Sequence, residues 1–226
     1  MKTNKAKPAL KPWVALFDLD GTLTWHDTLL PFLVGFLRRR PHKALKLWRL
    51  PFALARYWQD RDRGTLKSSV IRMLMGGERR ELLDAWAHTF VAELKLKERF
   101  RPLALAVLEA HRIAGDHLIL LSASPDLYVP LIGRLLGFEL TLCTELRWQA
   151  DRLDGSLKTA NRRGEEKLAC LKWLREQYPA LPVIAYGNSA SDVEHLREAD
   201  RALLVNGDNA ARRLAARWNI PVSNWS

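Results

Sequence analysis

The most constraining feature of this chain is a short apolar run that ends abruptly in two carboxylates. Val14, Ala15, Leu16 and Phe17 are followed directly by the sequence Asp18-Leu-Asp20-Gly21-Thr22. Four apolar residues are too few for an ordinary helix, so the run predicts a buried strand. Side chains alternate along a strand, and Asp18 and Asp20 therefore start from the same face. Gly21 permits the sharp turn that would bring backbone N–H groups close to a ligand.

A carboxylate pair in this position has a clear chemical use. Ligands of parallel α/β sheets bind at the carboxyl ends of the strands, which is where the pair lies. One carboxylate can attack a substrate while the other moves a proton or helps to hold a metal ion. An ordinary Asp-Gly turn after an edge strand would use the same residues. The rest of the chain has to decide between these interpretations.

Periodicity along the chain predicts a doubly wound α/β domain with a large helical insertion. Further strands are expected at 117–121, 139–144, 182–186 and 202–205, and a hairpin at 146–157 with Asp154-Gly155 as its turn. Helices are expected at 28–39, 43–59, 65–75, 79–96, 102–114, 125–136, 164–178, 191–199 and 210–218. We therefore expect an α/β fold with a mostly parallel sheet, a core domain at 10–24 and 105–226, and a helical cap domain at 25–104 inserted after the first strand.

Composition favours a globular protein of a reducing compartment. The chain has 226 residues, of which 48% are apolar, enough for a substantial core. Its two cysteines, Cys143 and Cys170, form neither a disulfide framework nor a metal-binding spacing. The start of the chain is basic and polar and does not resemble a secretory signal, and the longest apolar run, 29–37, is too short to span a bilayer. A cytoplasmic location is expected.

The predicted cap carries much of the positive charge. The net charge of the chain is +11, and no acidic residue occurs between Asp27 and Asp60, a stretch rich in arginine, lysine and aromatic residues. Such a basic, aromatic and amphipathic surface is typical of contact with anionic lipid, which would place the protein at the inner face of the membrane. A helical subdomain with a solvated basic face is the favoured alternative, and nucleic acid is the least favoured one. No obligate protein partner is evident.

Three further polar clusters lie where later core elements begin or end. Ser122 and Ala123 follow a predicted strand, where a hydroxyl and exposed N–H groups suit an anion, although a plain helix cap would look the same. Lys167 lies near the start of a helix, against the helix dipole, where pairing with an anion would explain it, although an ordinary solvated lysine is favoured when this residue is taken alone. Asn188 and Asp192 follow another strand and offer oxygen ligands suited to Mg²⁺, or else they cap a loop.

In this order the motifs resemble those of the haloacid dehalogenase superfamily of aspartate-nucleophile phosphotransferases. The segment 18–22 resembles the first motif, Ser122 the second, Lys167 the third and the segment 187–192 the fourth. The helical insertion resembles the cap of the phosphoserine-phosphatase-like branch. The resemblance covers residues 13 to about 204 and implies a Rossmann-like core. In layout the chain also resembles bacterial phosphatidylglycerophosphatase C, a family that acts on a lipid phosphate.

The resemblance implies a role for each motif. Asp18 would attack phosphorus and carry the phosphoryl group, while Asp20 would act as general acid and then as general base. A Mg²⁺ ion would be held by Asp18 and the main-chain carbonyl of Asp20, with Asn188 and Asp192 completing its shell. Family dehalogenases lack the second aspartate, so Asp20 indicates a phosphatase, with a phosphomutase as the less favoured alternative. The phosphate oxygens would be held by Ser122, Lys167 and the N–H groups of Leu19, Asp20 and Ala123.

Several alternatives about the substrate remain open. In the family that this chain resembles, aspartate is commoner than asparagine at the place of Asn188, so Asn188 should weaken metal binding. The pessimistic alternative is an inactive relative that binds no metal ion. Asp27 is a candidate contact for the substrate, or else the cap of the next helix. We expect a Mg²⁺-dependent phosphomonoesterase acting on a phosphorylated small molecule or a phospholipid. The alternatives are a phosphatase of small phosphoserine-like metabolites and a non-catalytic protein that binds polyanions.

Overall fold

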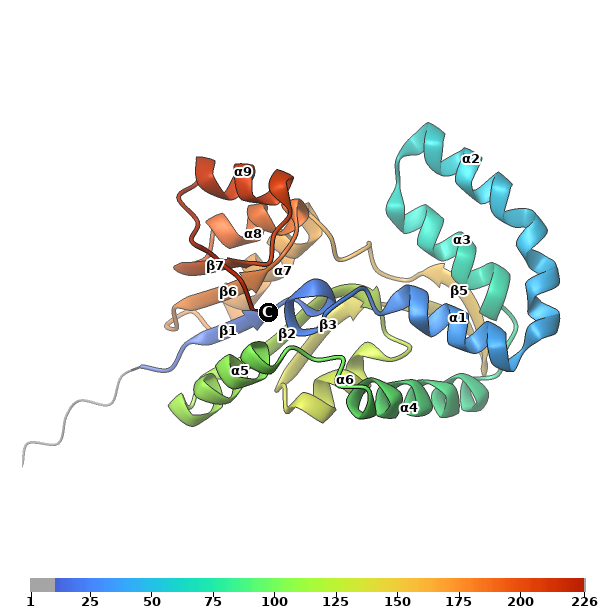
Figure 1. The fold of residues 1–226 in the computed structure, drawn as a ribbon, viewed down its shortest axis with the longest axis horizontal. Coiled ribbons are helices and arrows are strands. Elements are labelled where there is room, and N and C mark those ends of the chain that lie inside the picture. The colour runs from blue at the N-terminus through green and yellow to red at the C-terminus, as the bar shows by residue number, and fades with distance from the viewer. Residues whose placement is uncertain (1–10, 226) are drawn as a thin grey trace, which may run out of the picture.

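A parallel six-stranded sheet forms the centre of the computed structural model, which describes residues 11–225 (Figure 1). The first residue of the predicted core domain, residue 10, lies outside the described residues. The order of the strands across the sheet is β3 (Leu140–Thr144), β2 (His117–Pro125), β1 (Val14–Phe17), β6 (Val183–Gly187), β7 (Arg201–Val205) and β8 (Val222–Ser223). The predicted doubly wound, mostly parallel α/β fold is therefore confirmed.

Helices cover both faces of this sheet. One face carries α5 (Pro102–Ala114) and α6 (Val129–Leu136), and the other carries α7 (Glu165–Gln177), α8 (Val193–Arg197) and α9 (Asn209–Arg217). The residues of β1 alternate between the two layers: Ala15 and Phe17 pack on the first, Val14 and Leu16 on the second. A strand buried on both faces has no polar side, which explains why the sequence of β1 is continuously apolar.

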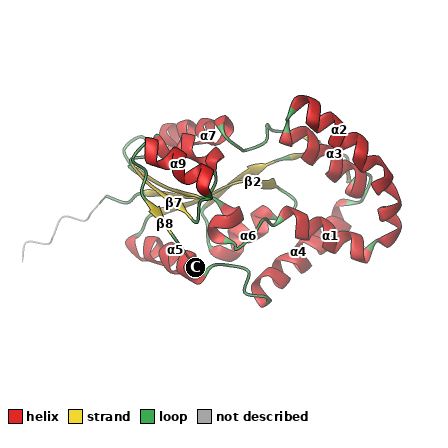
Figure 2. Cartoon of the chain, turned by 45° about the horizontal axis from the view of Figure 1, so that its top comes forward, coloured by secondary structure: helices red, strands yellow, loops and turns green. Residues whose placement is uncertain are grey.

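The segment between β1 and β2 is helical and extends beyond one end of the sheet (Figure 2). It contains α1 (Leu29–Arg39), a 3₁₀ segment (Pro41–Arg49), α2 (Leu50–Asp60), α3 (Arg63–Met75) and α4 (Arg80–Leu96). A hairpin of β4 (Leu146–Gln149) and β5 (Arg152–Leu157) packs against this insertion. The N–H of Gly77, between α3 and α4, donates a hydrogen bond of 2.8 Å to the carbonyl of Leu153 in β5.

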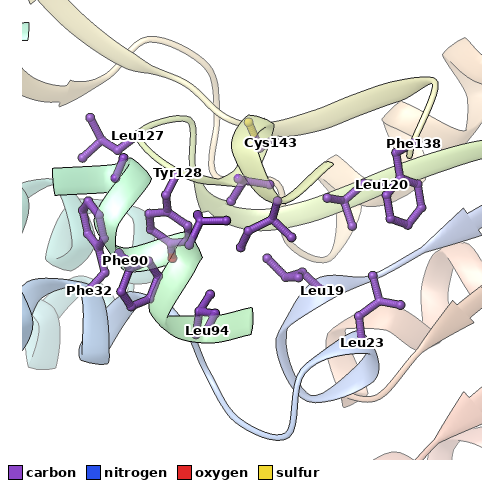
Figure 3. Packing of buried hydrophobic residues seen from close by; sticks show 14 of the residues in the cluster. Leu19, Leu23, Phe32, Phe90, Leu94, Leu120, Leu127, Tyr128, Phe138 and Cys143 are labelled. Atoms are coloured by element: carbon purple, nitrogen blue, oxygen red, sulfur yellow. The ribbon is translucent and has the colours of Figure 1, made fainter. Parts of the chain in front are cut away.

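The insertion and the sheet domain share one hydrophobic cluster (Figure 3). The ring of Tyr128, just before α6, lies 4.5 Å from the ring of Phe32 on α1 and 5.3 Å from that of Phe90 on α4, measured between centroids. All three side chains are buried. The helices α1 and α4 therefore pack directly on the sheet domain. The division into two domains at 25 and 104 stays a prediction.

Two predicted boundaries are wrong, and both corrections have a packing reason. The hairpin turns at Ala150, whose φ is +52°, and not at Asp154-Gly155, which lie inside β5. Gly155 is needed there because a Cβ atom would lie 2.8 Å from the Cα of Arg72 on α3. The helix predicted at 125–136 begins only at Val129, because Pro125 still pairs with Thr144 of β3.

The remaining differences are small. The helix predicted at 43–59 is divided into the 3₁₀ segment and α2, with Pro51 in the first turn of α2, where a proline has no hydrogen bond to lose. The short strand β8 was not predicted. None of the helices in the described range is long and apolar enough to cross a membrane.

Candidate active site

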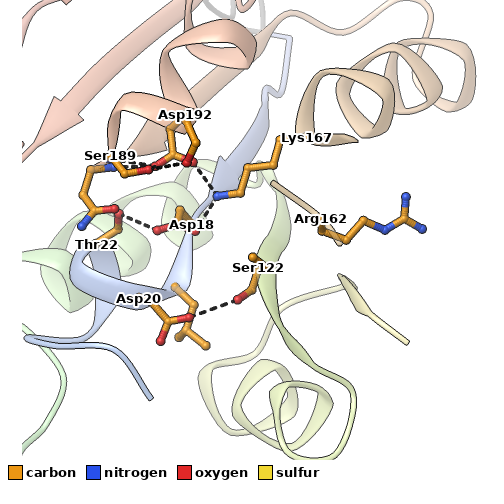
Figure 4. Close-up of polar contacts among 12 residues, drawn as sticks. Asp18, Asp20, Thr22, Ser122, Arg162, Lys167, Ser189 and Asp192 are labelled. Atoms are coloured by element: carbon orange, nitrogen blue, oxygen red, sulfur yellow. Dashed lines mark hydrogen bonds and ion pairs between the residues drawn. The ribbon is translucent and has the colours of Figure 1, made fainter. Parts of the chain in front are cut away.

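The predicted motifs come together at the carboxyl ends of three neighbouring strands. β1 pairs with β2 on one side and with β6 on the other, so the residues that follow these strands share one edge of the sheet. Asp18 follows β1, Ser122 lies in the last part of β2, and Asp192 comes shortly after β6 (Figure 4). Lys167 reaches the same point from the first turn of α7. Parallel pairing thus brings together residues that lie up to 174 positions apart, from Asp18 to Asp192.

Asp18 is buried and held by two contacts. One carboxylate oxygen accepts a hydrogen bond from the Nζ atom of Lys167 at 2.6 Å, and the other accepts one from the hydroxyl of Thr22 at 3.0 Å. Burial, together with the nearby carboxylates of Asp192 and Asp20, raises the pKa of Asp18 to about 7, although Lys167 acts in the opposite direction. A cation at this point favours the ionised form that a nucleophile needs.

Lys167 links the carboxylates of Asp18 and Asp192. Its Nζ atom lies 2.7 Å from Asp192, whose second oxygen accepts hydrogen bonds from the N–H groups of Asn188 and Ser189 and from the Ser189 hydroxyl. Burial alone would lower the pKa of Lys167, but the two carboxylates hold it above its usual range. Burial would raise the pKa of Asp192, but Lys167 holds it below its usual range. Both groups are therefore charged at neutral pH.

Asp20 has a different environment from Asp18. Its carboxylate accepts hydrogen bonds from the N–H group and hydroxyl of Thr28, at 2.7 and 2.6 Å, and from the hydroxyl of Ser124 at 2.6 Å. No cation lies within ion-pair distance of this carboxylate among residues 11–225. Burial and the neighbouring Asp27 raise the pKa of Asp20, although its hydrogen bonds oppose the shift. Two carboxylates with such different surroundings suit different tasks, one as a nucleophile and the other as a proton donor.

Gly21 shapes the turn between these aspartates and α1. Its φ is +82°, a conformation that favours glycine. A Cβ atom at this position would lie 2.0 Å from the side-chain nitrogen of Asn188, so the two residues are in close contact. The glycine thereby lets the loop after β6 approach the loop after β1.

A cavity of about 480 Å³ opens next to these groups. Its lining includes most of the predicted site residues: Asp18, Asp20, Asp27, Ala123, Lys167, Asn188 and Asp192. Leu19 and Ser122 are fully buried and do not line it; the Ser122 hydroxyl accepts from the N–H of Ser124 at 3.0 Å and lies 3.4 Å from Asp20. Asp27 lines the cavity and also accepts a hydrogen bond from the N–H of Leu30 at 3.1 Å, as a helix cap would.

Several residues of the site were not predicted. Thr28 and Ser124 hold the carboxylate of Asp20, and Tyr128 supports Thr28 through a hydrogen bond of 2.9 Å between their hydroxyls. Lys67, from α3 of the insertion, contacts the carbonyl of Ala123 and the side chain of Asn161, and burial lowers its pKa to about 8. The pattern around Ser122 contained a signal for Ser124, but nothing local indicated the other three.

The oxygen atoms of this site fit a hard divalent cation. The carboxylates of Asp18 and Asp192 converge on a single positive charge, that of Lys167, and oxygen is the ligand that Mg²⁺ prefers. The described residues hold no group of three or more His, Cys, Asp or Glu side chains arranged as a metal site. An ion at this place would therefore need the main-chain carbonyl of Asp20 or the amide of Asn188 besides the two carboxylates.

Comparison with known proteins shows the family to which this chain is similar. A family model described as haloacid dehalogenase-like hydrolase matches residues 15–197. The protein CicA of Caulobacter vibrioides is 36% identical over 191 residues, which cover 84% of each chain. A Mycobacterium tuberculosis protein named probable phosphatase Rv3661 is 27% identical over 223 residues, covering 94% of this chain and 75% of that protein.

Solved structures share the fold. A Bordetella pertussis protein of unknown function has a TM-score of 0.79 at 22% identity, covering 96% of this chain and 100% of that one. A probable phosphoserine phosphatase from Vibrio cholerae has a TM-score of 0.70 at 13% identity, covering 95% of this chain and 62% of that one. At these identities the likeness concerns the fold, and it agrees with the predicted α/β fold.

Proposed function

The chain belongs to the haloacid dehalogenase-like hydrolase family, and we propose that it hydrolyses phosphomonoesters through an aspartyl-phosphate on Asp18. The observation that carries this proposal is the pair of aspartates in one cavity: Asp18 is held by Lys167, and Asp20 is held only by hydroxyl and N–H groups. The first arrangement suits an ionised nucleophile, and the second suits a carboxyl that gains and loses a proton.

The reaction has two steps. A carboxylate oxygen of Asp18 attacks phosphorus, and the bond to the alcohol oxygen breaks as Asp20 gives that oxygen its proton. Asp20, now ionised, takes a proton from a water molecule, whose oxygen attacks phosphorus. Inorganic phosphate leaves, and the carboxylate of Asp18 and the proton on Asp20 are restored. The raised pKa of Asp20 supports this exchange of roles.

Cations and N–H groups would hold the transferred phosphoryl group. The ammonium of Lys167 lies at the nucleophile, and the N–H groups of Asp20 and Ala123, which line the cavity, are the further proposed contacts. The N–H of Leu19 and the hydroxyl of Ser122, proposed from the sequence motifs, lie behind the cavity lining. Donors fixed in advance stabilise charge that develops during phosphoryl transfer. Ser122 also supports this arrangement by accepting the N–H of Ser124, the residue that positions Asp20.

Mg²⁺ is the proposed cofactor. Asp18, Asp192, Asn188 and the main-chain carbonyl of Asp20 would hold it, since they supply the oxygens at the edge of the cavity. When bound, the ion would neutralise phosphate charge and orient the phosphoryl group for attack.

Phosphate release from a panel of phosphomonoesters tests the function. We expect release that depends on Mg²⁺, stops with chelator, and falls by at least about 10³-fold in Asp18→Asn, because the amide is no nucleophile. Asp20→Asn should release phosphate more slowly than the wild type from esters whose leaving alcohol has to be protonated. Asp84→Asn on the exposed face of α4 is the matched control. Unchanged release in Asp18→Asn would contradict the mechanism, and no release by the folded wild type would favour the polyanion-binding alternative.

A phospholipid is a second candidate substrate, favoured by the surface of the insertion. Trp48, Phe52 and Trp58 on the 3₁₀ segment and α2 are each more than 60% exposed. Lys46 and Arg49 accompany them in the sequence. Exposed aromatic rings next to basic side chains are typical of proteins that lie on an anionic membrane surface.

Vesicle binding separates the two classes of substrate. If the substrate is a lipid, the wild type should sediment with phosphatidylglycerol vesicles at low salt and release phosphate from a phospholipid monoester in those vesicles. The triple variant Trp48→Ser, Phe52→Ser and Trp58→Ser should lose both properties and keep its activity on soluble esters. A wild type that ignores anionic vesicles and hydrolyses soluble esters efficiently would leave the small phosphorylated molecule as the substrate.

A further inference from the structure

A second cavity adjoins the catalytic one. Its volume is about 840 Å³, and its lining comes from the end of α2, from α3, from the end of β5, and from the segment between β5 and α7. Arg63, Asn161, Arg163 and Ser191 line both cavities, so the two meet at these residues. A ligand with one end at Asp18 can therefore extend past this junction into the second cavity.

The second cavity is strongly basic. Its lining contains five arginines and a single acidic residue, Asp62. The carboxylate of Asp62 already accepts hydrogen bonds from the N–H of Gly64 and the hydroxyl of Thr65. The five arginines are Arg56, Arg61, Arg63, Arg72 and Arg163. Arg56 forms an ion pair with Asp60, and Arg72 forms one with Asp154. The remaining three arginines still outnumber the one carboxylate of the lining, and such an excess of positive charge attracts an anionic ligand.

The two arginines at the junction differ from ordinary surface arginines. Arg72 is paired with Asp154, but within residues 11–225 neither Arg63 nor Arg163 lies within ion-pair distance of a carboxylate. Arg163 is half-buried, and its burial and the nearby charge of Arg63 lower its pKa, although the carboxylates of Asp192 and Asp18 act in the opposite direction. The protein thus holds two positive charges near each other where they are partly removed from water. Their repulsion and lost hydration cost free energy, and an anion bound between them would offset that cost.

We propose that the Arg63–Arg163 junction binds a second phosphoryl group of the substrate. The preferred substrate is then a phosphomonoester that carries another phosphate besides the one transferred to Asp18. This inference rests on the proposed phosphatase function. Guanidinium groups suit a phosphoryl group because their N–H groups match two of its oxygens at once. A phosphate also carries more negative charge than a carboxylate, so it neutralises two guanidinium groups more fully.

Matched pairs of soluble substrates test the proposal. Fructose 6-phosphate against fructose 1,6-bisphosphate, and 3-phosphoglycerate against 2,3-bisphosphoglycerate, each differ by one phosphate. Glycerol 3-phosphate and 3-phosphoglycerate differ in that a carboxylate replaces a hydroxymethyl group, with no second phosphate. In at least one of the first two pairs the second phosphate should raise kcat/KM by about tenfold or more, the size of effect that a charge-assisted hydrogen bond gives. The carboxylate should raise it by less.

Substitution of the junction arginines locates the effect. In Arg63→Gln and in Arg163→Gln the ratio of kcat/KM between bisphosphate and monophosphate should fall toward one. Arg134→Gln removes the same charge from the exposed surface of α6 and should keep the wild-type ratio. Arg63 is exposed on the first turn of α3, so its variant tests the idea even if Arg163→Gln fails to fold.

The outcomes separate this inference from the function on which it rests. No phosphate release from any compound would overturn the proposed phosphatase. Release that is equally fast from both members of each phosphate pair, or a preference for the added carboxylate as large as that for the phosphate, would overturn the second phosphoryl site alone. A preference that survives both arginine substitutions would overturn its placement at this junction.

Discussion

At the scale of single residues, Asn188 is the member of the site that departs from the family pattern, in which aspartate is commoner. Its amide contacts Gly21 and lies at the edge of the cavity that holds Asp18 and Asp192. An amide offers an oxygen to a metal ion but no negative charge, so the attraction for a dication is weaker than with aspartate.

We predict that Asn188→Asp binds Mg²⁺ more tightly, by about tenfold, because it adds one negative charge beside the ion. Titration calorimetry of the protein without substrate measures the Kd directly. Asn219→Asp adds the same charge at an exposed position outside the cavity and should leave the Kd unchanged. An equal Kd in wild type and Asn188→Asp would place the side chain outside the metal shell.

Asp126 gives a prediction about pH. Burial raises the pKa of this carboxyl to about 6, while its oxygen accepts the N–H of Leu146 at 3.2 Å. Between pH 4 and 6 the folded protein binds the proton more tightly than the unfolded chain does, so this residue contributes stability at low pH that is lost as pH rises through 6. We expect the free energy of unfolding in urea, wild type minus Asp126→Asn, to fall by about 2 kcal/mol from pH 4 to pH 7. Parallel pH curves for the two proteins would contradict this.

At the scale of elements, Arg101 ties together the segments that enter and leave the insertion. It precedes α5, and its guanidinium donates hydrogen bonds to the carbonyls of Thr24, Trp25 and Trp225 at 3.0–3.4 Å. Thr24 also forms a β-bridge with Phe100. The side chain of Arg101 thus joins the segment that enters the insertion, the segment that leaves it, and the end of the described chain.

Arg101→Lys should therefore destabilise the protein although it keeps the charge. An ammonium cannot reach three carbonyls in the geometry of a planar guanidinium, and buried carbonyls without donors are costly. We expect the free energy of unfolding to fall by about 1–3 kcal/mol in urea titrations. Arg99→Lys, two residues earlier and exposed, is the control and should change little. Equal stabilities of the two variants would mean that the contacts of Arg101 contribute nothing.

At the scale of the whole molecule, the shared hydrophobic cluster couples the insertion to the sheet. Phe90 of α4 and Phe32 of α1 both pack on Tyr128, whose hydroxyl reaches Thr28 next to Asp20. Packing between the layers therefore also supports the site. Such continuous packing favours a single cooperative unfolding transition.

Phe90→Ala should lower the stability of the entire chain by about 3–4 kcal/mol, through lost burial and the cavity left behind. Calorimetry and circular dichroism should show one transition that moves to lower temperature as a unit. Leu96→Ala, exposed on the same helix, should have almost no effect. Two transitions of which only one moves would show that the insertion unfolds independently.

The sequence alone determined the elements and the order of the motifs. An apolar run too short for a helix indicated β1, alternation of strand and helix indicated the parallel sheet, and the side chains after β1, β2 and β6 had to meet because parallel strands end at one edge. These inferences succeeded because they depend on local periodicity and on a general rule of sheet topology.

Only the tertiary structure decided how the insertion meets the site. Thr28 contacts Asp20 and Lys67 contacts Ala123, while Arg63 and Arg163 line the same two cavities. Nothing in the spacing of these residues along the sequence indicates that they meet. The glycine at 155, inside β5, likewise follows from the close approach of α3 to that strand. Such contacts depend on how helices pack back on the sheet, which is a matter of side-chain shape across the whole core and not of local periodicity.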